Sequence, residues 1–172
     1  MNLKLAIFRP LLKRAMEKHG HGAALGFELT KVGRGEIEMT FPYKEEVVGN
    51  PITGVIHGGV IVSLLDTACG SAAITTLTSP SITPTMDLRL DYMHPAEPRQ
   101  PIYISAKVYR NSSNVIFCRG SAWQDDPENP IAHCVATFMK VDSPSISFGN
   151  VIRSRLNRLV RGDKAYEREA DK

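Results

Sequence analysis

The chain has 172 residues, of which 42% are hydrophobic and 23% are charged, and its formal net charge is +3. This length allows one domain with a sizeable core but not two independent domains, and the composition is ordinary for a globular protein. Much of the positive charge lies after Asn150. The balance of charge therefore excludes a polybasic nucleic-acid binder.

The first 20 residues predict a short amphipathic helix, because apolar residues recur at positions 5, 8, 12 and 16. Lys4 and the Arg9-Pro10 pair interrupt the apolar run, and no small-residue cleavage site follows, so the segment does not have the pattern of a signal peptide. No stretch reaches membrane-spanning length without a charge. We expect a cytoplasmic protein without stable membrane insertion.

Six segments have the pattern of β-strands. In "GEIEMTFPY", Ile37, Met39 and Phe41 alternate with polar residues, which is typical of a strand with one buried face. A strand is also expected just before it, over residues 26–32. Four more are expected after residue 84, at 85–93, 101–110, 114–123 and 130–141, with turn-forming residues in the connections "NSSN" and "QDDPEN".

A segment with helical spacing separates the second and third of these strands. It begins at Gly58 and runs for about 18 residues without proline, with apolar residues all round, as expected for a helix enclosed by a sheet. The order helix, two strands, long helix, four strands predicts an α+β fold with a largely antiparallel sheet around the central helix. Residues 1–149 are expected to form the single domain, and residues 150–172 a basic C-terminal helix and tail.

Asp66 is unusual because it is the only charged residue between Gly58 and Met86. An ionised carboxylate without a partner in apolar surroundings costs several kcal/mol. Two interpretations are open. The acid is structural, bonded to backbone N–H groups or to a hydroxyl, or it is a general base or nucleophile, which a partly desolvated carboxylate suits well.

Gly58 and Gly59 lie where the helix is expected to begin. The first N–H groups of a helix have no partner within the helix and carry partial positive charge, so they can polarise a carbonyl or hold an oxyanion. The alternative is that the glycines only permit a tight turn into the helix.

The spacing of Gly58 and Asp66 constrains any shared chemistry. Eight residues correspond to about 12 Å along a helix, whereas one reacting carbonyl needs its donor and its attacking group within about 3–3.5 Å. If both residues are catalytic, they act from different chains. Two antiparallel copies of the helix around a two-fold axis would bring them together, which predicts a homodimer with two shared sites.

Three further residues are candidates, each with a structural alternative. His57 can bind substrate, donate to a carbonyl, or pin the loop. Asn50, before Pro51, can orient a water or carbonyl, or be an ordinary turn residue. Thr85 offers a hydroxyl at the start of a strand, although most strand threonines have no chemical role.

The segments "HGGVIVSLLDTACG" and "TMDLRLDYMHPA" together resemble the hotdog-fold acyl-CoA thioesterases of the PaaI-like group. The shared pattern is HGG, an Asp seven residues after the second Gly, and a Thr-containing strand that ends near Pro. The resemblance spans about residues 26–141. It implies a hotdog fold, in which an antiparallel sheet wraps a long helix, and a homodimer or a dimer of dimers that needs no metal or redox cofactor.

The resemblance also implies residue roles. Asp66 would be the general base or nucleophile in thioester hydrolysis, and the Gly58 N–H from the opposite subunit would polarise the thioester carbonyl. His57 and Asn50 would position the thioester or the loop. Thr85 would orient water or Asp66.

Substrate binding is the expected role of Gly59 and Arg110. Arg110 precedes the "NSSN" turn and can reach a CoA phosphate, or it is a solvated residue at a strand end. The basic residues of the tail also have two interpretations, a solvated face or a surface that attracts CoA phosphates or an anionic membrane. These residues are Arg153, Arg155, Arg158 and Arg161.

Other functions of the same fold remain alternatives. Hydration or dehydration of acyl thioesters usually pairs a histidine with a carboxylate in a different arrangement, which this sequence lacks. A non-catalytic acyl-CoA-binding dimer is also possible. The acyl group, and the choice between CoA and an acyl carrier protein as donor, are left open.

The cysteines and histidines show no metal-binding spacing. Cys69, Cys118 and Cys134 are odd in number and lie far apart among apolar neighbours, so we expect reduced core thiols. The five histidines form no zinc pattern.

Overall fold

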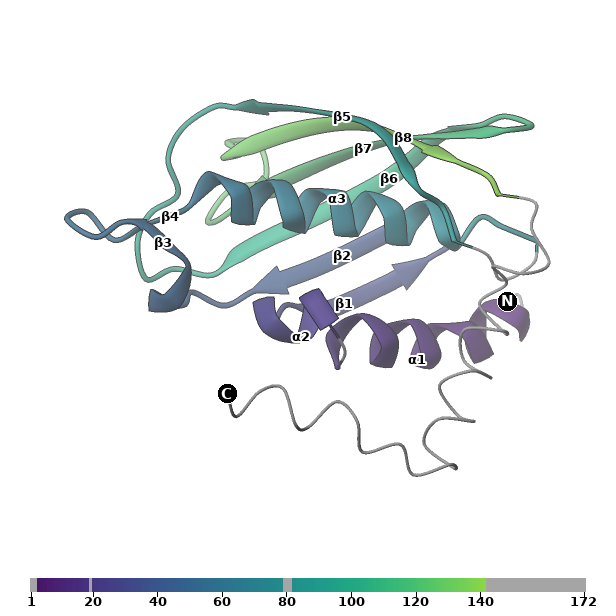
Figure 1. Cartoon of the computed structure of the whole chain (residues 1–172), viewed down its shortest axis with the longest axis horizontal. Helices are drawn as coiled ribbons and strands as arrows, with labels where there is room; N and C mark the ends of the chain where they lie inside the picture. Colours follow the sequence, from purple (N-terminus) through teal and green to yellow (C-terminus); the bar gives the residue numbers. More distant parts are fainter. Residues whose placement is uncertain (1–2, 19, 79–81, 142–172) are drawn as a thin grey trace, which may run out of the picture.

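In a computed structural model, which describes residues 3–18, 20–78 and 82–141, one sheet curls around one long helix (Figure 1). The sheet has six strands in the order β1-β2-β6-β7-β8-β5, and every neighbouring pair is antiparallel. The strands are β1 (Glu28–Gly33), β2 (Glu36–Phe41), β5 (Thr85–Tyr92), β6 (Ile102–Asn111), β7 (Val115–Trp123) and β8 (Ala132–Met139). This arrangement confirms the expected α+β fold.

The helices are α1 (Leu3–Glu17), α2 (Gly20–Leu25) and the central α3 (Gly58–Ile74). Between β2 and α3 the chain forms a short 3-10 helix, η1 (Glu45–Val47), and a two-stranded ribbon of β3 (Val48–Asn50) and β4 (Val55–Ile56). The expected N-terminal helix and the six long strands are confirmed. Neither α2 nor the β3-β4 ribbon was predicted from the sequence.

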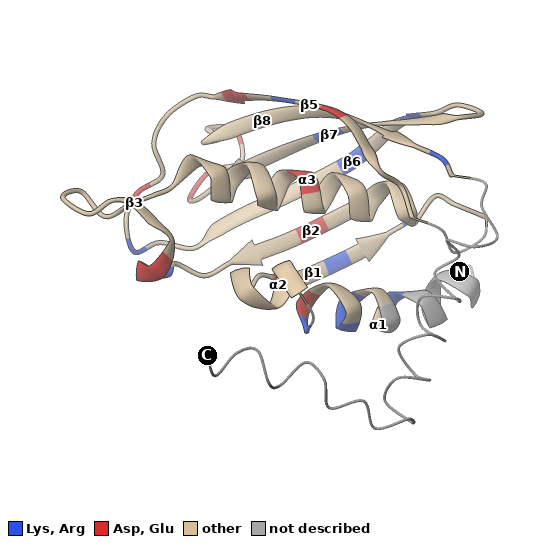
Figure 2. Cartoon of the chain, viewed as in Figure 1, with Lys and Arg blue, Asp and Glu red and all other residues tan. Residues whose placement is uncertain are grey.

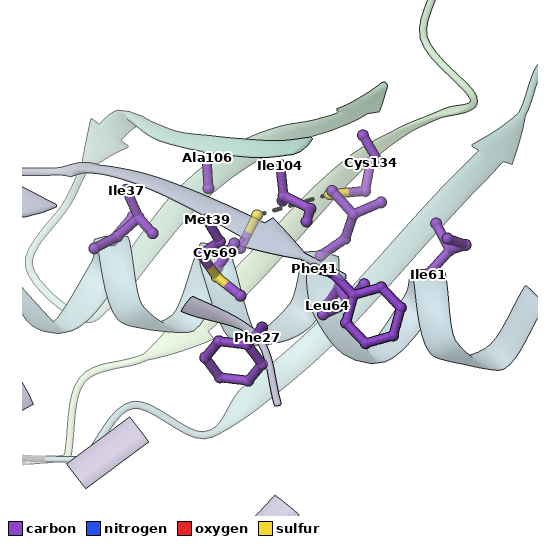
Figure 3. Packing of buried hydrophobic residues seen from close by; sticks show 14 of the residues in the cluster. Phe27, Ile37, Met39, Phe41, Ile61, Leu64, Cys69, Ile104, Ala106 and Cys134 are labelled. Atoms are coloured by element: carbon purple, nitrogen blue, oxygen red, sulfur yellow. Dashed lines mark hydrogen bonds between the residues drawn. The ribbon is translucent and has the colours of Figure 1, made fainter. Parts of the chain in front are cut away.

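The core lies between the inner face of the sheet and α3 (Figure 3). The alternation read from β2 is confirmed, because Ile37, Met39 and Phe41 are all buried. From α3, Leu64 and Leu65 are fully buried against the sheet. Burial of these side chains removes apolar surface from water, which is the main force that holds the helix in place.

The expectation that α3 is enclosed on all sides was wrong for one face. Gly59 is exposed, and Ser63, Asp66, Gly70 and Ile74 are only partly buried. These positions recur at helical spacing, so they form one stripe along α3. A single curled sheet covers only part of a helix, and the uncovered stripe carries mainly small or polar side chains.

Gly120 lets β7 approach α3 closely. A Cβ atom at this position would lie 2.9 Å from Cys134 Sγ, which is shorter than real contacts, and 3.0 Å from Leu65 Cδ2, which is a very tight contact. Cys69 Sγ lies 3.7 Å from Cys134 Sγ across the same contact (Figure 3). All three cysteines are free and buried, as expected, and burial raises the pKa of Cys118 to about 12.

Helix α1 covers one edge of the sheet, at β1, whereas the other edge, at β5, is open in the described part of the chain. At the β1 edge, Lys13 Nζ from α1 donates to the Leu29 carbonyl (2.9 Å), and the Leu29 N–H donates to Glu17 Oε1 (2.6 Å). The β5 edge has no such cover in the described part of the chain, and Met86, Tyr92 and Met93 on and beside this strand are each more than half exposed. An open edge with exposed apolar side chains is a surface on which another strand can pair.

None of the helices within the described ranges is long and apolar enough to cross a membrane. The predicted C-terminal helix and tail, residues 150–172, lie outside the described residues.

Candidate functional site

The start of α3 is held by hydrogen bonds on both sides of His57. The His57 N–H donates to the Val47 carbonyl (3.0 Å), and the His57 carbonyl accepts from the Val60 N–H (2.9 Å). His57 is also the N-cap of α3, because its Nδ1 accepts from the Gly59 N–H at 2.9 Å. Gly59 therefore uses its N–H to close the first turn of the helix and does not offer it to a ligand.

The bond at Nδ1 fixes the tautomer of the neutral His57 ring. A nitrogen that accepts a hydrogen bond carries no proton, so the neutral ring has its proton on Nε2. The side chain is exposed. Its Nε2–H is thus available as a donor, while Nδ1 holds the first turn of α3.

Gly58 differs from its neighbours because its N–H has no partner among the described residues. Its carbonyl, by contrast, accepts from Tyr92 Oη at 2.7 Å. The peptide group before Gly58 is held by the bond from Val60, and the peptide group after it is held by the bonds to His57 and Tyr92. The Gly58 N–H itself is left pointing away from the helix start. A fixed, unpaired N–H at a helix N-terminus suits an anion or a polarised carbonyl oxygen.

Tyr92 was not predicted as a site residue. The alternation of the β5 sequence placed it on the same face as Leu88 and Leu90, the face that meets α3. This alternation in the sequence was the feature from which a contact between Tyr92 and α3 could have been predicted. The sequence did not reveal that the contact would be made by the hydroxyl group to Gly58.

Asp66 lies in the middle of α3, where Figure 2 shows the one acidic band of that helix. Its Oδ1 accepts a hydrogen bond from Thr85 Oγ1 at 2.9 Å, so the structure brings these two predicted residues together. In the described part of the chain no Lys, Arg or His forms an ion pair with Asp66, and Oδ2 has no partner. Among the described residues, the carboxylate is therefore anchored by one oxygen, and the other accepts no bond.

Asn50 forms the turn that joins β3 to β4. Its Oδ1 accepts from the Ile52 N–H (3.0 Å) and the Thr53 N–H (3.4 Å), and its carbonyl accepts from the Gly54 N–H (2.8 Å). This is the structural alternative considered above. The side-chain Nδ2 group is not used in the turn, so it remains a possible donor.

Arg110 lies near the opposite end of α3 from Gly58. The next residue, Asn111, donates from Nδ2 to Thr76 Oγ1 at 3.0 Å, just beyond the C-terminal end of the helix. A helix of 17 residues is about 25 Å long, so Arg110 and Gly58 are not part of one site within a single chain. Arg110 is exposed on β6.

The described residues contain no group of three or more His, Cys, Asp or Glu side chains arranged to hold a metal ion. The candidate site thus consists of two parts on α3, the Gly58 N–H with its supporting side chains and the Asp66–Thr85 pair. The curled antiparallel sheet around α3 defines a hotdog-type protein.

Comparison with known proteins agrees with this class. The model of the thioesterase superfamily matches residues 53–131, which include both parts of the site. A stretch of 129 residues is 30% identical to the medium/long-chain acyl-CoA thioesterase YigI of Salmonella typhimurium, covering 67% of this chain and 82% of that protein. The chain therefore belongs to the thioesterase superfamily.

Solved structures confirm the fold. A protein from Pseudomonas aeruginosa is 44% identical and has a TM-score of 0.68, covering 76% of this chain and 96% of that chain. PaaI of Escherichia coli, from the phenylacetic acid degradation operon, is 16% identical with a TM-score of 0.67, covering 81% of this chain and 93% of that chain. The resemblance to hotdog-fold thioesterases read from the sequence is confirmed.

Proposed function

We propose that this protein hydrolyses acyl-CoA thioesters to the free acid and CoA. Membership of the thioesterase superfamily supports thioester hydrolysis, and similarity to an acyl-CoA thioesterase supports CoA as the carrier. The observation that carries the proposal is the pair of unused groups on α3. Within the described residues, the Gly58 N–H is a fixed donor without a partner, and Asp66 is a carboxylate anchored by one oxygen whose second oxygen accepts no bond.

We infer that each site is shared between two copies of the chain. Gly58 and Asp66 are eight residues apart on one helix, about 12 Å, which is too far for both to act on one thioester. The open β5 edge and the uncovered stripe of α3 provide a surface for a second copy. Two α3 helices that run antiparallel would place Gly58 of one chain beside Asp66 of the other.

In this arrangement the Gly58 N–H polarises the thioester carbonyl and stabilises the oxyanion that forms when the carbonyl carbon is attacked. The attacking group is either a water that gives its proton to Asp66, or Asp66 itself, which then forms an anhydride that water opens. Either route breaks the C–S bond and releases CoA, whose thiolate takes a proton. Thr85 fixes the orientation of Asp66 in both.

Other expected residues have secondary roles in the proposal. The His57 Nε2–H and the Asn50 amide would help to position the thioester beside the start of α3. In an antiparallel pair of helices, the C-terminal end of one lies near the N-terminal end of the other, so Arg110 would serve the partner's site and bind a CoA phosphate. Hydrolysis by this mechanism uses no metal or redox cofactor. We also propose that the protein is cytoplasmic, and its free cysteines agree with a reducing compartment.

Thiol release by the purified protein tests the proposal. Medium- and long-chain acyl-CoA esters are the first substrates to try, in view of YigI, followed by short-chain and aromatic esters. We expect CoA release by the wild-type protein and a loss of at least about a hundredfold in kcat for Asp66→Asn. Binding of acyl-CoA without any release of thiol would instead identify a non-catalytic acyl-CoA-binding protein.

Isotope labelling can identify the nucleophilic route. In a single turnover in ¹⁸O-labelled water, an anhydride that water opens at the Asp66 carbonyl leaves one labelled oxygen in Asp66 and passes one unlabelled Asp66 oxygen to the acid product. A general base leaves Asp66 unlabelled and places one labelled oxygen in the product, and so does an anhydride opened at the acyl carbonyl, so label in Asp66 is the result that identifies the nucleophile.

A further inference from the structure

The peptide group between Gly58 and Gly59 is held from both sides by side chains. Its carbonyl accepts from Tyr92 Oη at 2.7 Å, and its N–H donates to His57 Nδ1 at 2.9 Å. His57 belongs to the loop before α3, whereas Tyr92 comes from the end of β5, 34 residues after Gly58. We propose that Tyr92 is a positioning residue for hydrolysis, which acts through this peptide group to fix the direction of the Gly58 N–H.

The helix start needs such support. The first N–H groups of a helix have no bond to a preceding turn, and two successive glycines have the widest choice of backbone angles. A donor that stabilises an oxyanion contributes most when it is already aimed at the position of the negative charge before the reaction. A hydroxyl that restrains the adjacent peptide therefore favours catalysis without touching the substrate.

The contact between Tyr92 and Gly58 is close and depends on the absence of a side chain. A Cβ atom at Gly58 would lie 2.9 Å from Tyr92 Oη and 3.3 Å from Cζ, so any larger residue would push the hydroxyl away from the carbonyl. The ring thus lies directly over the first turn of α3. Partial burial raises the pKa of Tyr92 above its usual value of 10.0, so the hydroxyl keeps its proton and remains a donor at neutral and mildly alkaline pH.

Strand β5 contacts both parts of the site. Thr85, its first residue, bonds to Asp66, and Tyr92, its last residue, bonds to Gly58. Because β5 is also the open edge of the sheet, pairing with a second copy would restrain the strand that orients the acid and the donor. In the proposed dimer, Tyr92 would therefore link the pairing of the two chains to the geometry of the helix start.

This inference rests on the proposed hydrolysis, and Tyr92→Phe tests it by removing only the hydroxyl group. We expect kcat to fall about fivefold with KM changed less than twofold, which corresponds to about 1 kcal/mol and is typical of one lost hydrogen bond. Tyr103→Phe is the matched control, because Tyr103 lies on β6 and its hydroxyl makes no bond in the described structure. We expect it to leave kcat unchanged.

A double-mutant comparison shows whether Tyr92 acts through Gly58. Gly58→Ala keeps the N–H but displaces the tyrosine hydroxyl, so Tyr92→Phe should have little further effect on kcat in that background. In the wild-type background, Tyr92→Phe should also shift the amide NMR signals of Gly58 and Gly59. A structural role elsewhere would not produce this combination.

The outcomes distinguish this inference from the proposed function. If wild-type protein releases CoA and Asp66→Asn does not, but Tyr92→Phe equals wild type, the inference about Tyr92 is wrong and the proposed function stands. An undiminished fivefold effect of Tyr92→Phe in the Gly58→Ala background would also overturn it. If wild-type protein releases no CoA from any ester, both are wrong.

Discussion

Thr85 Oγ1 donates a hydrogen bond to Asp66 Oδ1 at 2.9 Å, which joins the first residue of β5 to the middle of α3. The bond accounts for the lone acid in an apolar helix, because a hydroxyl partner and partial exposure replace the hydration that burial removes. It also holds the carboxylate in one orientation, and no residue in the described ranges bonds to the second oxygen.

Replacing Thr85 tests whether this bond orients the acid for catalysis. Thr85→Val keeps the shape of the side chain but removes the donor, and we expect kcat to fall about tenfold, since a bond to a charged group contributes roughly 1.5–3 kcal/mol. Thr85→Ser keeps the hydroxyl and should retain most of the activity. Steady-state kinetics of the two variants check this, and equal activity of Val and Ser would contradict the role of the bond.

The N–H of Gly58 can be removed with little change to the backbone. Gly58 is the first residue of α3, a position where proline is well accepted, and His57 already has the extended conformation that a following proline requires (φ −60°, ψ 131°). We expect Gly58→Pro to lower kcat by a further hundredfold or so relative to Gly58→Ala, as for loss of an oxyanion donor.

Gly58→Ala is the appropriate reference for that variant. Both substitutions add a Cβ atom next to Tyr92, but only proline removes the N–H. Circular dichroism and thermal unfolding should show that both variants are folded. Similar kcat values for the two would mean that the N–H does not take part in the reaction.

The open β5 edge is expected to be the surface on which two copies meet. Met86→Lys places a charge on this strand, and in a symmetric pair the two lysines would face the same interface, so we expect the dimer to dissociate. Ile52→Lys, in the exposed β3-β4 turn, is the control. Light scattering should give about twice 19.0 kDa for wild type and control, and 19.0 kDa for Met86→Lys; a monomeric wild type would contradict the shared site.

Gly120 is predicted to matter for stability and not for the reaction itself. A methyl group there would overlap Cys134 Sγ and Leu65 Cδ2 and press on α3. We expect Gly120→Ala to lower the free energy of unfolding by about 1–3 kcal/mol. Arg119→Ala, exposed on the same strand, should have an effect within about 0.5 kcal/mol in denaturant unfolding. An equal effect of the two would mean that this contact is not tight.

Much of the fold was predictable because its long elements have clear periodicity. The alternation in β2 reflects burial of one face of the strand, and the proline-free apolar run of α3 reflects burial of most of the helix surface. The juxtaposition of Asp66 and Thr85 followed from the family resemblance and is present in the structure.

Other features were not predictable because they depend on contacts between distant segments. The six-residue α2 contains two glycines, and one of them, Gly22, lies so close to the Met16 carbonyl that no side chain would fit, so packing and not helix propensity forms this helix. The open face of α3 depends on how far the sheet curls. The bond from Tyr92 to Gly58 joins residues 34 positions apart.

The central claim is that one site uses Gly58 of one chain and Asp66 of the other, and mixing two inactive variants tests it most directly. When Gly58→Pro and Asp66→Asn proteins are unfolded together in equal amounts and refolded, half of the dimers should contain one of each. Such a dimer has one site with both groups intact, so the mixture should recover about a quarter of wild-type kcat, while each variant refolded alone stays inactive. No recovery, in a mixture shown by native mass spectrometry to contain mixed dimers, would contradict the shared site.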